Sequence, residues 1–404
     1  MNESLTGRSS TGKILITGGC GFIGSNLAAH YLEKGWEVVV YDNFSRLGAE
    51  SNAAWLADRA DGRLDFEIAD IRNFASLCKA VMGADVVAHL AAQVAVTHSV
   101  VDPREDFEIN ALGGFNLLEA VRACGADPVV IYASTNKVYG ELNGAQFHEM
   151  EQRYEYEEHE YGIAENFPID LHSPYGCSKG ALDLYMLDYA RIYGLKTVVF
   201  RQSCIYGPRQ FGVEDQGWVA HFIISALLGR PITIYGDGKQ VRDILHVRDL
   251  ITAFEAAIEH IDVSRGQAYN IGGGSHNTLS LLELIDRLRA KVDRPITLEF
   301  DDWRPGDQKV YVSDIRKAKG DLGWEPLIGV GVGLSDLRQW VQSNRELFEH
   351  ADLAEMLPEP SSDETLPTRP LREGPATPLP SLTAAEAKAR RVRAITGPLK
   401  EPVE

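Results

Sequence analysis

The stretch that decides the fold reads KILITGGCGFIG and occupies residues 13–24. A short apolar run leads there directly into glycines, and a segment of helical periodicity follows at residues 26–34. Helical stretches such as residues 112–123 separate further apolar runs of strand length, which lie at residues 38–41, 64–68, 86–90, 129–133 and 197–200. Continuous apolar strands that alternate with helices are typical of a parallel sheet covered on both faces. The sequence therefore predicts an α/β fold with a doubly wound, Rossmann-type parallel sheet.

The glycines of this stretch, Gly18, Gly21 and Gly24, stand between a strand and a helix. Glycines at this spacing allow a tight turn and a close approach of backbone to a pyrophosphate, which the helix N-terminus attracts. Asp42 ends the second predicted strand, where a carboxylate accepts hydrogen bonds from both adenosine ribose hydroxyls and repels a 2′-phosphate. The pattern predicts NAD rather than NADP, although the nearby Arg46 weakens that preference.

Tyr175 and Lys179 lie four positions apart at the start of a predicted helix, with Pro174 near its first position. An ammonium beside a phenol favours phenolate, so Tyr175 could act as a general base near neutral pH. A pair on a helix surface without any catalytic role is the alternative. A second match to the spacing, Tyr235 and Lys239, falls in a glycine turn and cannot present both groups on a helix.

Composition excludes several classes of function. The formal charge of −18 over 404 residues argues against binding to nucleic acid or to an anionic membrane, but not against a small phosphorylated substrate held by local arginines. The five cysteines show no metal-ligand spacing, so we expect reduced thiols and no metal centre. The polar N-terminus and the lack of a span of roughly 20 apolar residues predict a cytoplasmic protein.

The chain changes character along its length. We expect an NAD-binding domain over residues 12–205, with a returning segment near residues 240–275, and a smaller, partly discontinuous substrate lobe over residues 206–345. Nine of the 18 prolines follow Met356, so residues 351–404 are predicted to be a disordered tail. A short basic helix at residues 384–395 that docks a partner is the alternative.

Four motifs together resemble the extended short-chain dehydrogenases/reductases, in the group of NAD-dependent nucleotide-sugar epimerases and dehydratases. They are the glycine loop, Leu90-Ala91-Ala92, Val138-Tyr139-Gly140 and the Tyr175–Lys179 pair. The resemblance runs from about residue 13 to about residue 340. It implies a homodimer that binds NAD tightly, regenerates it at each turnover and acts on a nucleotide-diphosphate sugar. The NAD contacts that it implies, beyond Tyr175 and Lys179, are Gly18, Gly21, Phe22, Ile23, Gly24, Asp42, Asn43, Asp70, Ile71, Leu90, Ala91 and Ala92.

The same resemblance implies the substrate contacts. Thr135 would hydrogen-bond the reacting sugar oxygen as the third catalytic residue. Arg242 and Arg304 would hold the diphosphate, which a bidentate guanidinium suits, and Asp307 would contact the nucleoside ribose. Ion pairing at the surface is the alternative for each arginine. The full set of implied substrate contacts is Thr135, Arg209, Gln216, Val219, Arg242, Arg304 and Asp307.

The residues after Thr135 discriminate between reactions. The dehydratases of this group carry an Asp-Glu pair there and the related decarboxylases a glutamate, whereas this chain has Asn136 and Lys137. Elimination is therefore disfavoured and epimerisation favoured. Residues 106–110, 134–140, 172–180, 215–219 and 238–243 further resemble the CDP-paratose 2-epimerases, which implies transient oxidation at carbon 2 of a CDP-linked 3,6-dideoxyhexose. A UDP-hexose or UDP-uronate 4-epimerase is the nearest alternative, and a non-enzymatic NAD-responsive binding protein a more distant one.

Overall fold

The computed structural model describes residues 11–125, 127–304 and 307–349. The chain divides into two units, residues 1–343 and residues 344–404. The described part of the second unit holds one short helix, α14 (Glu346–Glu349). The predicted tail at residues 351–404, with its alternative basic helix, lies outside the described residues. All that follows concerns the first unit.

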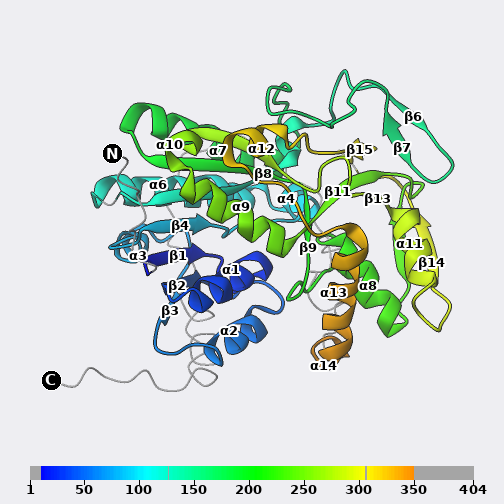
Figure 1. Ribbon diagram of the computed structural model, residues 1–404, viewed down its shortest axis with the longest axis horizontal. Coiled ribbons are helices and arrows are strands. Elements are labelled where there is room, and N and C mark those ends of the chain that lie inside the picture. The colour runs from blue at the N-terminus through cyan, green and yellow to red at the C-terminus, as the bar shows by residue number, and fades with distance from the viewer. Residues whose placement is uncertain (1–10, 126, 305–306, 350–404) are drawn as a thin grey trace, which may run out of the picture. The chain divides into compact units, whose positions relative to one another are not determined.

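Seven parallel strands form the main sheet, in the order β12-β8-β5-β4-β1-β2-β3 (Figure 1). They are β1 (Lys13–Thr17), β2 (Glu37–Asp42), β3 (Leu64–Ile68), β4 (Val86–His89), β5 (Val129–Thr135), β8 (Lys196–Gln202) and β12 (Gln267–Ile271). The six predicted strands are confirmed, and β12 returns from the second half of the chain to pair with β8. The strand order reverses between β1 and β4, where such sheets bind ligands beyond the carboxyl ends of their strands.

Helices cover the sheet in two groups. One group, in which α1 contacts both other members, is α1 (Phe22–Glu33), α2 (Ala49–Ala57) and α9 (Val247–Glu259). The other, linked through α6, is α3 (Phe74–Ala80), α6 (Gly113–Ala123) and α7 (Ser173–Tyr193). Leu15, Val130 and Val199 of the sheet pack with Leu117 and Leu182 of this second group in one buried cluster. The strands read as continuous apolar runs because both of their faces are covered.

Short elements complete this part of the chain and the region around it. They are α4 (Val96–Val101), α5 (Pro103–Phe107), the π-helix η1 (Glu108–Leu112), the 3-10 helix η2 (Asn136–Tyr139), α10 (Ile261–Ser264) and α12 (Arg316–Leu322). A separate antiparallel hairpin pairs β6 (Phe147–Glu149) with β7 (Tyr154–Tyr156). Within the described ranges, we find no helix with the length and apolarity that a bilayer span requires.

A second group of elements lies beside the carboxyl ends of β5 and β8, at the right of Figure 1. Its strand β11 (Val241–His246) pairs with β9 (Cys204–Tyr206), β13 (Thr278–Ser280) and β15 (Val310–Tyr311). A small sheet joins β10 (Ile232–Tyr235) to β14 (Leu298–Asp301). The helices of this group are α8 (Trp218–Leu228), α11 (Leu281–Arg289), which starts with a capping box at Ser280 and Glu283, and α13 (Val330–Ser343).

Candidate active site

The glycine loop brings backbone atoms into close contact without intervening side chains. Gly18 has a φ of +70°, and a Cβ there would lie 2.7 Å from the backbone nitrogen of Ala91. A Cβ on Gly24 would lie 2.3 Å from the carbonyl oxygen of Gly18. Helix α1 begins directly after Gly21, and no side chain caps its first turn. The backbone N–H groups of that turn, including the N–H of Phe22, can donate hydrogen bonds to a pyrophosphate.

Asp42 is held beside this loop by backbone donors. Its carboxylate accepts hydrogen bonds from the N–H of Cys20 at 2.9 Å and from that of Phe44 at 2.7 Å. The residue thus occupies the end of β2 next to the glycine turn, as a ribose-binding carboxylate requires. Arg46, the residue that weakened the preference for NAD, donates instead to Gln216 at 2.9 Å.

Four of the remaining predicted NAD contacts, Asn43, Asp70, Leu90 and Ala91, lie at the carboxyl ends of neighbouring strands. The N–H groups of Leu90 and Ala91 lie 3.2 and 3.3 Å from the Thr17 hydroxyl, which joins the ends of β1 and β4. Asn43 donates to Asp70 at 3.0 Å. Burial alone would raise the pKa of Asp70, but hydrogen bonds from Arg72 and Asn43 hold it below its usual value. The structure therefore gathers these residues around one edge of the sheet.

The three predicted catalytic residues meet at the end of β5. Thr135 is the last residue of that strand, and Tyr175 and Lys179 share one face of the first turns of α7. All three are more than nine-tenths buried or at that limit. Burial raises the pKa of Tyr175 to about 12, and a hydrogen bond with the Thr135 side chain opposes that shift. The side chains of Tyr175 and Thr135 therefore lie within hydrogen-bonding distance of each other.

Lys179 makes different contacts from those expected. Its Nζ donates to the carbonyl of Ala133 at 2.6 Å and lies 4.5 Å from the centre of the Tyr132 ring. Burial lowers the pKa of Lys179 to about 7, with Asp106 and other acidic charge opposing the shift. In the protein alone, burial outweighs any effect of the ammonium on Tyr175. The activation of Tyr175 by Lys179 stays a prediction.

A group of three residues, which we call the Asp307 cluster, lies next to Thr135. Arg242 Nη2 lies 2.6 Å from Asp307 Oδ1, and Lys137 Nζ lies 3.7 Å from the same oxygen. Arg304 binds Asp215 at 2.8 Å and stacks over the ring of Tyr235. Pro305 and Gly306, which separate Arg304 from Asp307, lie outside the described residues.

Comparisons with known proteins agree with this geometry. Residues 14–272 match the model of the NAD dependent epimerase/dehydratase family. The chain belongs to that family. The predicted NAD dependence is therefore confirmed, and the glycine loop and Asp42 fit the cofactor.

Relatives within the family carry different activities. The chain is 46% identical to a CDP-paratose 2-epimerase of Salmonella typhi, over 82% of this chain and 99% of that protein. It is 33% identical to a dTDP-glucose 4,6-dehydratase of Neisseria gonorrhoeae, over 84% and 98%. The solved structure of a UDP-glucuronic acid 4-epimerase from Bacillus cereus, in complex with UDP-glucuronic acid and NAD, matches with a TM-score of 0.71 and 31% identity, over 82% and 99%. The chain is thus an NAD-dependent enzyme of a family that includes both epimerases and dehydratases.

Three of the predicted substrate residues, Arg209, Gln216 and Val219, make other contacts within the protein. Arg209 places its guanidinium 4.3 Å from the ring of Trp55 and 5.8 Å from that of Trp340, on α2 and α13. Burial lowers the pKa of Arg209 to about 10. Gln216 bonds Arg46, and Val219 is buried in the first turn of α8. The contacts of Arg209 thus differ from those of the Asp307 cluster.

Tyr235 and Lys239, which have the same spacing as the catalytic pair, bond different partners. Tyr235 ends β10 and its hydroxyl donates to Glu214. Lys239 follows in a turn, and its Nζ donates to Glu149 at 2.5 Å. The two side chains share no partner, which agrees with their assignment to a glycine turn.

Sequence reasoning gave no role to a buried carboxylate behind the catalytic pair. Asp106 is fully buried and accepts a hydrogen bond from Asn110 at 2.9 Å. Burial raises the pKa of Asp106, and hydrogen bonds from Ser178 and Asn110 with the charge of Lys179 oppose this. A π-helix starts two residues later, and π-bulges are frequent at functional sites. The signal in the sequence was an aspartate on the buried face of a helix.

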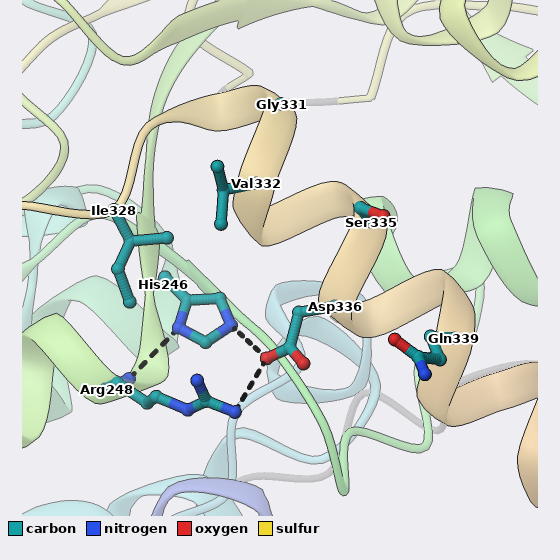
Figure 2. Close-up of a pocket in the computed structure, with 8 residues that line it drawn as sticks. All are labelled: His246, Arg248, Ile328, Gly331, Val332, Ser335, Asp336 and Gln339. Carbon is teal, nitrogen blue, oxygen red and sulfur yellow. Dashed lines mark hydrogen bonds and ion pairs between the residues drawn. The ribbon is translucent and has the colours of Figure 1, made fainter.

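An open hollow of about 550 Å³ lies apart from these residues, between the start of α9 and α13 (Figure 2). Its polar lining includes what we call the Asp336 cluster. His246 Nε2 and Arg248 Nη2 lie 3.1 and 3.2 Å from Asp336 Oδ2. The Nδ1 atom of His246 accepts from the N–H of Arg248 at 3.3 Å. None of the predicted site residues lines this hollow.

Proposed function

We propose that the chain epimerises carbon 2 of a CDP-linked 3,6-dideoxyhexose, converting CDP-paratose to CDP-tyvelose with a retained NAD. One observation carries this proposal: Asn136 and Lys137 stand where dehydratases need an acid and a base. Asn136 donates to Gln308 at 3.2 Å, and Lys137 approaches Asp307. An amide exchanges no proton near neutral pH, so Asn136 cannot supply the acid that expels water from the sugar. The 46% identity to a CDP-paratose 2-epimerase supports the same assignment.

The residues of the chain perform the proton chemistry. Bound NAD supplies the acceptor for a hydride from carbon 2 and the donor that returns it. Tyr175 takes the proton of the hydroxyl at carbon 2 while the carbon–oxygen double bond forms, and Thr135 hydrogen-bonds the same oxygen. Once the other face of the keto sugar is presented, Tyr175 would return its proton to the oxygen at carbon 2, and Thr135 would keep its hydrogen bond to that oxygen. Because burial raises the pKa of Tyr175 to about 12, ionisation needs positive charge nearby, which a protonated Lys179 and a bound, oxidised nicotinamide would provide.

We further propose a division of labour along the chain. Residues 12–205, with the segment near residues 240–275, would hold NAD, and residues 206–345 would hold most of the nucleotide sugar. Both sets of contacts converge on Thr135, since the Asp307 cluster lies beside it.

A UDP-sugar 4-epimerase is the second candidate, supported by the likeness to the Bacillus cereus enzyme. Incubating the purified protein without added NAD, and following the ratio of epimers by NMR, separates the two. We expect conversion of CDP-paratose and not of UDP-glucose, UDP-galactose or UDP-glucuronate. Conversion of UDP-sugars alone would contradict the proposal, and turnover of no sugar nucleotide despite clear NAD binding would favour a binding protein.

A further inference from the structure

The Asp307 cluster carries more positive than negative charge. Lys137 and Arg242 approach the same oxygen of Asp307, and the three side chains are 24%, 9% and 22% exposed. The charges of Arg242 and Lys137 hold the pKa of Asp307 below its usual value, against the effect of burial. One carboxylate therefore faces two basic groups in a mostly buried place, and such an imbalance is costly unless an anion joins it.

The neighbours of Lys137 do not supply that anion. The largest charge effects on the lysine come from Asp307, Arg242 and the thiol of Cys204. Burial raises the pKa of Cys204, which favours the neutral thiol, and its Sγ accepts a hydrogen bond from Trp218 at 3.4 Å. Burial also lowers the pKa of Lys137, while Asp307 opposes this shift. An added anion would oppose the effect of burial and stabilise the charged form of the lysine.

The backbone of Lys137 is hydrogen-bonded to the Thr135 hydroxyl. The backbone N–H of Lys137 donates to Thr135 Oγ1 at 3.2 Å, which caps the helix η2. Gln308, next to Asp307, accepts from Asn136 at 3.2 Å and donates to the carbonyl of Gly140 at 2.5 Å. One short turn thus carries both the Thr135 hydroxyl and the lysine, and it is bonded at both ends to the Asp307 segment.

We propose that Lys137 binds the β-phosphate of the nucleotide-diphosphate sugar and so brings carbon 2, rather than carbon 4, to Thr135. This inference rests on the proposed function, since it assumes that such a sugar occupies the site. Carbon 2 is bonded directly to carbon 1, which carries the phosphate, whereas carbon 4 lies across the ring. A cation two residues from Thr135 meets the phosphate only if the reacting carbon is near the anomeric end. Lys137 is then a specificity-determining residue.

The test compares CDP with CMP, which share base, ribose and α-phosphate. We would titrate both into NAD-loaded wild type, Lys137→Met and Lys137→Arg by calorimetry. Lys137→Met should weaken CDP binding by about tenfold to hundredfold, as for loss of a charged hydrogen bond, and change CMP binding by less than about twofold. Lys137→Arg should keep most of the affinity for CDP.

Lys317→Met is the matched control, because Lys317 is also partly buried and donates to the carbonyl of Ala268 at 2.8 Å. It should leave both affinities unchanged. If Lys137→Met loses affinity for CDP and CMP equally, or loses none, the phosphate contact is overturned. If Lys137→Met has a lowered Tm or does not retain NAD, the same titrations are carried out with Lys137→Gln.

The outcomes separate this inference from the proposed function. A Lys137-dependent preference for CDP over CMP without turnover of CDP-paratose would contradict the proposed function and leave the phosphate contact standing. The same preference together with epimerisation of UDP-sugars at carbon 4 would overturn the positioning of carbon 2. Failure of wild type to bind CDP or UDP would overturn both.

Discussion

The Asp307 cluster and the Asp336 cluster have the same composition in outline, two basic side chains on one aspartate, but differ in charge. In the Asp336 cluster one base is His246, whose side chain is fully buried. Burial lowers the pKa of His246, and an imidazole titrates near neutrality to begin with, so the ring is neutral. Arg248 and Asp336 then balance each other. The usual pKa of Lys137 lies roughly three to four units above neutrality; burial lowers it and Asp307 opposes that shift, so we infer that the Asp307 cluster keeps a positive surplus.

This difference shows why an open hollow is a weaker guide to function here than unbalanced charge. The Asp336 cluster lines a hollow of about 550 Å³, and the charge of its aspartate is balanced by Arg248 at 3.2 Å. The Asp307 cluster lacks one negative charge and lies beside Thr135. Matched substitutions in and beside the two clusters test this difference.

The largest effect is expected at Tyr175. Tyr175→Phe removes the proton acceptor beside Thr135 and should slow conversion of CDP-paratose by about a thousandfold or more, in the range of general acid–base catalysis. His246→Gln in the other region should change the rate by less than about twofold. Epimer ratios over time measure both, and bound NAD released by denaturation should be equal in the two proteins. If His246→Gln converts CDP-paratose as slowly as Tyr175→Phe does, the Asp336 cluster takes part in the reaction and the two regions do not differ as described.

A smaller effect is expected from the two arginines. Arg242→Met removes a buried guanidinium from the Asp307 cluster and should weaken CDP binding by about tenfold to hundredfold. Arg248→Met removes a cation whose charge Asp336 already balances, and CDP affinity should stay within about twofold. Calorimetric titration of the NAD-loaded proteins gives both values. Equal losses in the two variants would mean that the clusters do not differ in this way.

The smallest effect concerns pH. Because burial lowers the pKa of His246, this imidazole binds a proton in the unfolded chain at a pH where it stays neutral in the folded chain. Wild type therefore loses stability as pH falls below about 6.5. His246→Gln removes this loss. The Tm of the variant minus the Tm of wild type should therefore be roughly 1 to 3 °C larger at pH 5 than at pH 7. Calorimetric scans of wild type, this variant and a His148→Gln control, at an exposed histidine, measure the shift. A constant difference between variant and wild type would contradict the assignment.

Local patterns in the sequence were sufficient for the sheet and the cofactor loop. The strands, Gly18, Gly24 and Asp42 follow from residues close together in the chain, since each glycine and each apolar run acts on its immediate neighbours. The same holds for Tyr175 and Lys179, which one helix places on one face.

Contacts between distant segments could not be read in this way. The turn after Thr135 meets Gln308 across 172 positions, so the shared carboxylate of Lys137 and Arg242 had no signal in either segment. The role of Arg209 as a substrate contact stays a prediction, and its contact with Trp55 joins segments 154 positions apart, so no local pattern could have predicted it. The motif identified Lys137 only by the absence of a carboxylate, and the role that we propose for it rests on its contact with the carboxylate that Arg242 shares.

Deuterium at carbon 2 of CDP-paratose gives the most direct test of a borrowed and returned hydride. The labelled substrate would be incubated in ordinary water with purified protein and no added NAD, and the product examined by mass spectrometry and NMR. We predict CDP-tyvelose that retains the deuterium at carbon 2, because the label leaves to bound NAD and comes back to the same molecule. Product that has exchanged its deuterium for solvent hydrogen, or substrate that remains unconverted, would contradict the account.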